Sequence, residues 1–129
     1  MKQSFRELKV WKKSVQLTVL VYRFTGAFPK EEVYGLTSQM RRAAVSVASN
    51  IAEGSARGTK REFRQFVKLA RGSNCELQTQ LVISRELELG DRTQCDELED
   101  LSEEIGRMLS ALSRYLTREI KSRELTTEN

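Results

Sequence analysis

Histidine is absent from this chain of 129 residues, and proline occurs once. Without an imidazole side chain, histidine-based acid–base catalysis, catalytic triads and histidine-ligated zinc sites are excluded. Only seven glycines accompany the single proline, and this shortage of turn-forming residues favours helices over strands joined by tight turns. The length suits one domain, which can bury a core without disulfides or metals.

Cysteine is scarce, and no apolar run is long. Cys75 and Cys95 form no CxxC motif, so we expect free, buried thiols with a role in the core. Residues 1–14 are charged and lack the apolar region of a signal peptide. The longest apolar stretch, residues 15–24, is too short and too interrupted to span a bilayer. These features predict a soluble cytoplasmic protein.

What the chain does contain is four segments in which apolar residues recur at every third or fourth position, the spacing of a helix face. The first segment begins with a capping box of Ser4 and Glu7 and is expected to end near Thr25. The second is expected to begin at Pro29 and to end at Gly54.

The third and fourth segments also begin with capping boxes. The third starts after Thr59 and should run to about Leu89. The fourth starts after Asp91 and should fray beyond Ile120, which leaves one domain over residues 1–120 and a polar tail over residues 121–129. The expected inner faces are Leu8, Trp11, Val15, Thr18 and Tyr22 in the first segment, Leu36, Met40, Ala43, Val47 and Ile51 in the second, Phe63, Phe66, Val67, Ala70, Asn74, Leu77 and Leu81 in the third, and Leu98, Leu101, Ile105, Met108, Leu112 and Tyr115 in the fourth.

Four amphipathic segments with short connections predict an all-α fold, an antiparallel up-down-up-down four-helix bundle. The second segment has an unusual composition, because residues 41–54, "RRAAVSVASNIAEG", place small side chains around most of the helix. Small residues allow neighbouring helices to approach closely. We therefore expect this helix to be contacted on more than one side, within the bundle or by another subunit.

The central part of the chain also carries a resemblance. Residues 28–77, "FPKEEVYGLTSQMRRAAVSVASNIAEGSARGTKREFRQFVKLARGSNCEL", together with "LKVWKKSVQL" near the start, are similar to the signature of the four-helix-bundle proteins encoded in intervening sequences of bacterial 23S ribosomal RNA genes. One departure is Ala48, where many relatives have proline, and it implies a straighter second helix.

The resemblance implies a four-helix bundle and, by analogy, a ring-shaped homopentamer. It implies no settled activity, because the family is mostly of unknown function. A distantly similar bundle, the accessory protein of diversity-generating retroelements, is a basic pentamer that binds nucleic acid and a reverse transcriptase. That analogy concerns the fold and says little about function.

Charge is unevenly distributed: residues 1–30 and 41–71 are mainly basic, whereas residues 76–108 are mainly acidic. A basic stripe on the third segment can follow phosphates, so we predict a nucleic-acid-binding surface without base specificity, for structured RNA or for DNA. Its residues are Arg57, Lys60, Arg61, Arg64, Lys68 and Arg71, with Arg41 added from the second segment. The alternative is a solvated face, or pairing with the acidic residues Asp96, Glu97, Glu99, Asp100, Glu103 and Glu104.

A second polar group lies along one edge of the second segment: Arg42, Ser46, Ser49, Asn50 and Glu53. An asparagine that leans toward an apolar face must find partners for its amide, and it can fix the packing of neighbouring helices. We interpret this group as a structural or interface network, with a ligand pocket as the alternative. Within this group, Arg42 and Glu53 could be joined through the residues between them.

No residue pattern indicates catalysis. The sequence "GSARG" at residues 54–58 lacks the GK[ST] of a phosphate loop, and the acidic run at residues 96–104 has no Glu-x-x-His for a di-iron site. We therefore expect a protein that is not an enzyme and that uses no cofactor, metal, membrane or small-molecule substrate. Two hypotheses remain: a homo-oligomeric nucleic-acid-binding protein, or a scaffold that assembles with itself and recruits a protein partner.

Overall fold

The computed structural model describes residues 4–127, and within that range every regular element is a helix. The four long helices are α1 (Lys9–Thr25), α2 (Ser38–Ala56), α3 (Lys60–Glu86) and α4 (Arg92–Thr127). Short elements precede two of them: the 3-10 turn η1 (Phe5–Glu7) before α1, and the 3-10 turn η2 (Lys30–Glu32) and π-helical turn η3 (Val33–Thr37) before α2. The all-α fold is confirmed.

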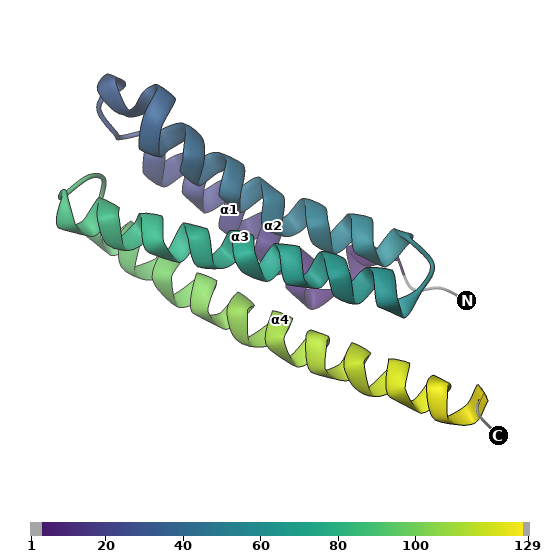
Figure 1. Ribbon diagram of the computed structural model, residues 1–129. Coiled ribbons are helices and arrows are strands. Elements are labelled where there is room, and N and C mark those ends of the chain that lie inside the picture. The colour runs from purple at the N-terminus through teal and green to yellow at the C-terminus, as the bar shows by residue number, and fades with distance from the viewer. Residues whose placement is uncertain (1–3, 128–129) are drawn as a thin grey trace.

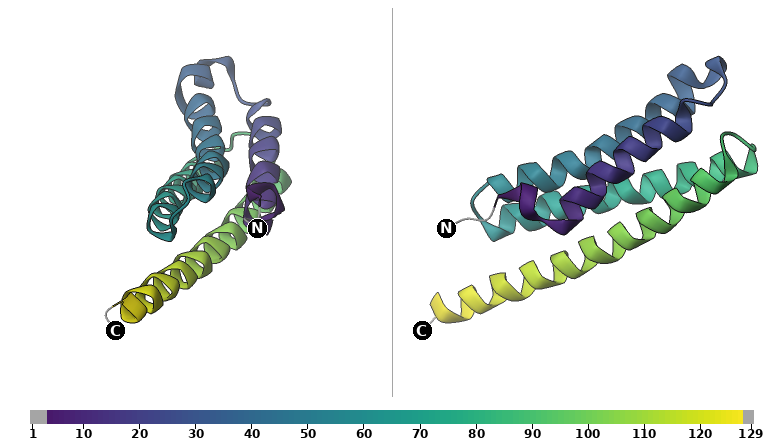
Figure 2. Two further views of the ribbon diagram at one scale, coloured as in Figure 1. Left: turned by 90° about the vertical axis from the view of Figure 1, so that its right-hand side faces the viewer. Right: turned by 180° about the vertical axis from the view of Figure 1, so that it is seen from behind.

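Successive helices run in opposite directions, as Figures 1 and 2 show. Ion pairs between α3 and α4 agree with an antiparallel arrangement. Arg85, at the end of α3, pairs with Asp96 near the start of α4, and Lys60, at the start of α3, pairs with Glu119 near the end of α4. The start of α1 and the end of α4 therefore lie at the same end of the bundle (Figure 1). No helix within residues 4–127 is long and apolar enough to cross a membrane.

The predicted inner faces of α2 and α3 are confirmed, because Met40, Val47, Ile51, Leu77 and Leu81 are fully buried. These two helices pack with small residues between them. Gly54 lies against Phe66, where an added Cβ would come within 2.5 Å of the Phe66 Cβ. The small side chains of α2 thus serve close packing within the bundle.

The predicted inner face of the first helix is right at Leu8 and Trp11, which pack against the core, but wrong further along α1. Val15 and Tyr22 are 37% and 44% exposed, whereas Leu17, Val21 and Phe24 are fully buried. The helix carries two neighbouring apolar stripes, and the one that includes Leu17 faces the core. In α4 the prediction is partly right, since Leu98 and Ile105 are buried, but the face continues through Leu109 and Leu116 and leaves Tyr115 46% exposed.

The caps also differ in part from prediction. The Thr59 hydroxyl caps α3 by accepting from the Glu62 N–H (3.2 Å), and the Asp91 carboxylate accepts from the Gln94 N–H (2.9 Å) at the start of α4. Ser4, in contrast, accepts from the Arg6 N–H and caps only η1, so the predicted capping box of the first helix is wrong.

Several helix ends differ from prediction. The second helix begins at Ser38 and not at Pro29, because non-helical backbone angles at Gly35 interrupt the chain there. Gly54 does not end α2, which continues to Ala56, and the chain turns at Gly58 with a φ of +101°. The third helix stops at Glu86, before the predicted Leu89, and the fourth continues beyond Ile120 to Thr127.

A buried polar pair joins α3 to α4. The Asn74 amide donates to the Ser102 carbonyl (2.9 Å), and the Ser102 hydroxyl donates back to the Asn74 Oδ1 (2.8 Å). Both side chains are at least 98% buried. Of the two cysteines, which are free as predicted, Cys95 is buried and Cys75 is exposed, so the prediction of two buried thiols is wrong for Cys75.

Candidate nucleic-acid interface

The first half of the basic stripe is bound to the C-terminal half of α4. Lys60 pairs with Glu119 (3.1 Å), and this hydrogen bond lowers the pKa of the Glu119 carboxyl below its ordinary value. Arg61 pairs with Glu124. Arg64 donates to the Thr117 hydroxyl (3.3 Å). These three side chains hold two helices together at the end of the bundle.

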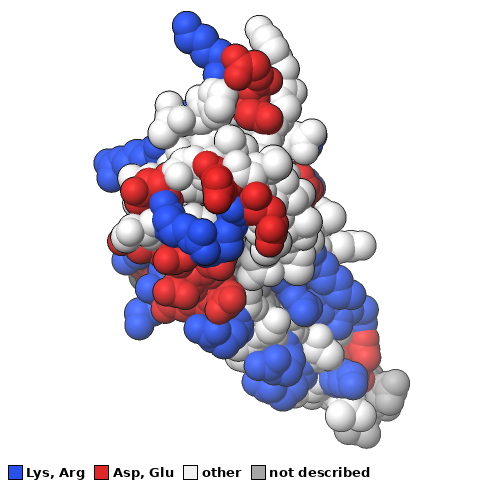
Figure 3. Space-filling model, turned by 90° about the vertical axis from the view of Figure 1, so that its left-hand side faces the viewer, with Lys and Arg blue, Asp and Glu red and all other residues white. Residues whose placement is uncertain are grey.

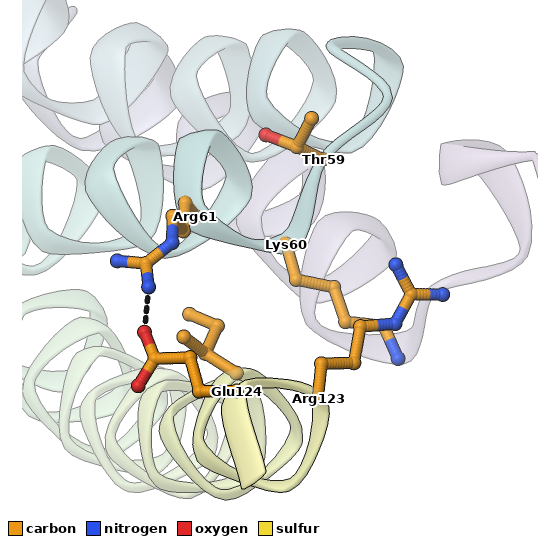
Figure 4. Close-up of a pocket in the computed structure, with 6 residues that line it drawn as sticks. Thr59, Lys60, Arg61, Arg123 and Glu124 are labelled. Carbon is orange, nitrogen blue, oxygen red and sulfur yellow. Dashed lines mark ion pairs between the residues drawn. The ribbon is translucent and has the colours of Figure 1, made fainter. Parts of the chain in front are cut away.

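A small pocket of about 220 Å³ lies between the start of α3 and the end of α4. Figure 4 shows Arg61 reaching across it to Glu124, while Lys60 and Arg123 extend away from that ion pair. The pocket contains three cations and one carboxylate. Its cations already hold partners within the chain, so this end of the stripe is part of the helix packing.

Two predicted binding residues lie away from the stripe surface. Arg57 pairs with Glu53 (2.8 Å) and places its guanidinium 5.1 Å from the centre of the Phe66 ring. Arg41 lies near the opposite end of the bundle, where it bonds to the Thr25 hydroxyl (2.9 Å). The structure therefore does not bring Arg41 together with the other predicted residues.

The second half of the stripe is open. No hydrogen bond or ion pair joins Lys68 or Arg71 to another residue in the described range, and both are exposed. Arg71 lines a groove of about 510 Å³ between α3 and α4, opposite Arg107 and Arg114 of α4. These two arginines are also exposed and have no partner among residues 4–127.

The floor of this α3/α4 groove is polar and narrow. Asn74, Gln78 and Gly106 contribute to it, and an added Cβ at Gly106 would lie 3.3 Å from the Asn74 amide nitrogen. Glu103 is the one carboxylate among the lining residues, and Cys75 places its thiol-bearing side chain there as well. Three guanidinium groups facing one carboxylate give the groove a positive potential.

The acidic segment does not neutralise the stripe. Asp96 and Glu99 both pair with Arg85, and their hydrogen bonds raise the pKa of that guanidinium. Glu104 pairs with Lys13 of α1 (3.1 Å). Figure 3 shows the carboxylates gathered at the end of the bundle that carries the α3–α4 connection, with basic side chains further along the molecule.

The polar edge of α2 links it to α3. The hydroxyls of Ser46 and Ser73 share a hydrogen bond (2.8 Å), and Asn50 donates its amide to the Ser46 carbonyl (2.8 Å) one turn earlier. Arg42 lies 3.9 Å from Glu76 of α3. This edge is therefore a set of contacts within the bundle.

The α2 edge differs from prediction at Glu53 and Ser49, and the role of a second asparagine, on α3, was missed. Glu53 pairs with Arg57, so Arg42 and Glu53 are not joined. Ser49 is exposed and has no side-chain partner in the described range. Asn74, which the sequence placed only on an apolar face, is the asparagine that spans two helices.

Within residues 4–127 no three histidine, cysteine, aspartate or glutamate side chains come together as metal ligands. The Cys95 thiol lies in the core, and burial raises its pKa. A raised pKa disfavours the thiolate, which is the reactive form of cysteine.

Comparison with known proteins is consistent with this architecture. The sequence profile of the 23S rRNA-intervening sequence protein matches residues 6–111. The crystal structure of a protein with unknown function from the S23 ribosomal protein family of Bacteroides thetaiotaomicron VPI-5482 resembles the chain with a TM-score of 0.72 and 21% identity, covering 81% of this chain and 97% of that one. At this identity the likeness concerns the fold alone. No curated protein sequence matches the chain. Because the profile spans most of its length, the chain belongs to the family of 23S rRNA-intervening sequence proteins.

Proposed function

We propose that the protein is a non-enzymatic bundle that binds structured RNA through the α3/α4 groove, without base specificity. The observation that supports this most strongly is the set of three arginines, Arg71, Arg107 and Arg114, that line one groove and have no partner in the described range. Lys68 extends the same positive surface by about one helical turn along α3.

The composition of the groove favours contact with phosphates over contact with bases. Proteins that bind single strands stack bases on aromatic rings, and no aromatic side chain lines this groove. Arginine donates two parallel hydrogen bonds to a phosphate and stays charged at all relevant pH values. We therefore infer a preference for the backbone of a duplex over single-stranded RNA.

The first test measures binding of a fluorescent RNA duplex by anisotropy over a salt series. Affinity falls as salt rises, and each phosphate contact adds roughly 0.9 to the steepness of log affinity against log salt. The double variant R107Q/R114Q should therefore make this dependence shallower by about 2. The matched control R23Q/R92Q removes the same charge from exposed arginines outside the groove and should keep the wild-type slope. Equal slopes for the two variants would refute the groove as the binding surface.

A second test uses the two thiols. Cys75 lies in the groove and is exposed, whereas Cys95 is buried, so an alkylating reagent should modify Cys75 first in the folded protein. Bound duplex should slow that modification several-fold, and high salt should restore the rate. Alkylation at an unchanged rate under saturating RNA would place the ligand elsewhere.

A second candidate function is assembly. Leu69 is 55% exposed on α3, and Ile83 and Leu87, at the end of that helix and just beyond it, are 43% and 58% exposed. Their spacings of 14 and 18 residues place them on the same side as Leu69, roughly 21 and 27 Å along the helix axis. Exposed apolar residues toward both ends of one helix side fit a subunit contact, in line with the pentamer that the family resemblance implies. Analytical ultracentrifugation of L69S/L87S should then show a smaller particle than the wild type. The control V82S alters an equally exposed residue on another side of the helix.

A further inference from the structure

The Arg41 guanidinium is held in place by contacts with α1, but several of its N–H donors have no partner within the described residues. Its Nε donates to the Thr25 hydroxyl (2.9 Å), its Nη2 donates to the Tyr22 carbonyl (3.3 Å), and its guanidinium carbon lies 4.5 Å from the centre of the Tyr22 ring. These contacts fix the guanidinium at the end of α1. Two of its five N–H groups are used, and no carboxylate in residues 4–127 pairs with it.

The guanidinium lies beside a cavity of about 540 Å³ between the end of α1, η3 and the start of α2. Three cationic residues contribute to its wall: Lys30, Arg41 and Arg42. No aspartate or glutamate does so. The nearby Glu32 carboxylate instead accepts from the Leu36 N–H (3.4 Å) within η3, so it is directed to the backbone of that turn.

Thr37, which also lines the cavity, carries a buried hydroxyl without a partner. Thr37 is 93% buried, and its Oγ1 makes no hydrogen bond to any residue in the described range. The buried hydroxyls of Ser14, Thr25 and Ser84 all donate to the carbonyl four residues earlier in their α-helices. Thr37 is the last residue of the π-helical turn η3, whose wider spacing does not offer that carbonyl in the same place.

Aromatic and apolar groups complete the cavity. Tyr22, Phe28 and Val33 line it beside the cations, and its volume falls in the range of sites for small organic molecules. A buried polar group without a partner in a native structure commonly marks a place where a water or ligand atom belongs. The cavity therefore combines a fixed positive charge and an apolar wall, and the unpartnered Thr37 hydroxyl is buried behind that wall.

We propose that this cavity binds the oxyanion group of a small organic molecule, a phosphate or a carboxylate carried on an apolar body. Arg41 supplies the charge and the remaining N–H donors, and the Thr37 hydroxyl donates once the ligand or a bound water reaches it. The apolar body contacts Phe28 and Val33. This site lies at the other end of the bundle from the Lys60–Glu119 contact and shares no lining residue with the α3/α4 groove.

The test measures the rise in melting temperature that a ligand produces in the full chain, with phenyl phosphate and benzoate as probes and benzyl alcohol as the neutral control. A ligand that binds only the folded state raises the melting temperature, and the rise grows with the logarithm of ligand concentration once that concentration exceeds the Kd. We expect a rise with at least one anion and none with benzyl alcohol. A rise with phenyl phosphate alone identifies a phosphate site, and a rise with benzoate alone identifies a carboxylate site.

Variants separate the site from general effects of salt. R41Q should weaken binding about tenfold or more, because it removes the charged donor. T37V keeps the shape of the side chain, so it should weaken binding while raising the melting temperature of the protein without ligand. R107Q/R114Q changes only the α3/α4 groove and should bind both probes like the wild type.

Three results would overturn the proposal: no shift with either anion, equal shifts for the wild type and both T37V and R41Q, or an equal shift with benzyl alcohol. If R41Q does not fold, T37V and R41K carry the comparison, since R41K keeps the charge but loses the paired donors. The cavity and the α3/α4 groove are tested separately. A melting-temperature rise with an anion but no RNA binding supports the cavity alone, and RNA binding without such a rise supports the groove alone.

Discussion

At the scale of single residues, the identity of one asparagine sets how α3 and α4 meet. Asn74 and Ser102 exchange two hydrogen bonds in a mainly apolar interior, and any sliding of one helix past the other would leave both polar groups buried without partners. Asn50, which the sequence favoured for this role, bonds within its own helix.

We expect N74A to lower the free energy of unfolding by about 1–3 kcal/mol, because the Ser102 hydroxyl then stays buried without its acceptor. S102A should cost a similar amount by leaving the Asn74 Oδ1 unpaired. The double variant N74A/S102A should cost less than the sum, by about 0.5 kcal/mol or more, because the second change removes the orphaned group. Urea unfolding of the four proteins measures this coupling, and additive costs would show that the pair acts separately.

A second residue-scale prediction concerns Glu119. The hydrogen bond from Lys60 lowers the carboxyl pKa in the folded protein, with a smaller contribution from the Tyr115 hydroxyl. A lowered folded pKa adds stability above the unfolded pKa, and that stability is lost as the pH falls through the folded pKa. We expect K60M to return the Glu119 pKa toward its ordinary value, as carbon-detected NMR would show. The control K68M removes a lysine with no partner and should leave that pKa unchanged.

At the scale of helices, the sequence predicted two of the three caps and the buried faces of α2 and α3, but not the buried face of α1. The caps at Thr59 and Asp91 depend on a few neighbouring residues, so the sequence predicted them correctly. The buried face of α1 depends on which apolar stripe meets the other helices. Val15 and Val21 belong to stripes of similar character, and periodicity alone does not choose between them.

Two glycines inside helices, Gly54 and Gly72, differ in how closely other side chains approach them, so replacing each with alanine should have opposite effects on stability. At Gly54 an added Cβ would meet the Phe66 side chain at 2.5 Å, whereas at Gly72 nothing lies within 4 Å. G72A should therefore stabilise the protein by about 0.5–1 kcal/mol, the helix propensity difference between the two residues. G54A gains the same propensity but must separate α2 from α3, so we expect a net loss of about 1–3 kcal/mol. Thermal unfolding measures both, and a gain for G54A would show that the two helices are not held this closely.

At the scale of the whole molecule, the sequence predicted a basic surface but only part of its composition. Arg107 and Arg114 were missed because they follow an acidic segment, and only the antiparallel packing of α4 on α3 brings them opposite Arg71. The same packing pairs Lys60 and Arg61 with carboxylates near the end of α4. A one-dimensional charge pattern does not tell which cations face a partner helix and which face solvent.

The arrangement of charge, and not the net charge of +4, should therefore govern binding of RNA. Glu86 and Glu97 are exposed and have no partner in residues 4–127, and Glu97 lies roughly 15 Å along α4 from Arg107. That separation is about twice the Debye length at physiological salt, so E86Q/E97Q should raise the net charge by two and leave the salt slope unchanged. R107Q/R114Q lowers the net charge by two and should reduce the slope by about 2. Fluorescence anisotropy over a salt series compares both with the wild type. Equal and opposite changes in slope would mean that the RNA responds to total charge, and the groove would lose its special role.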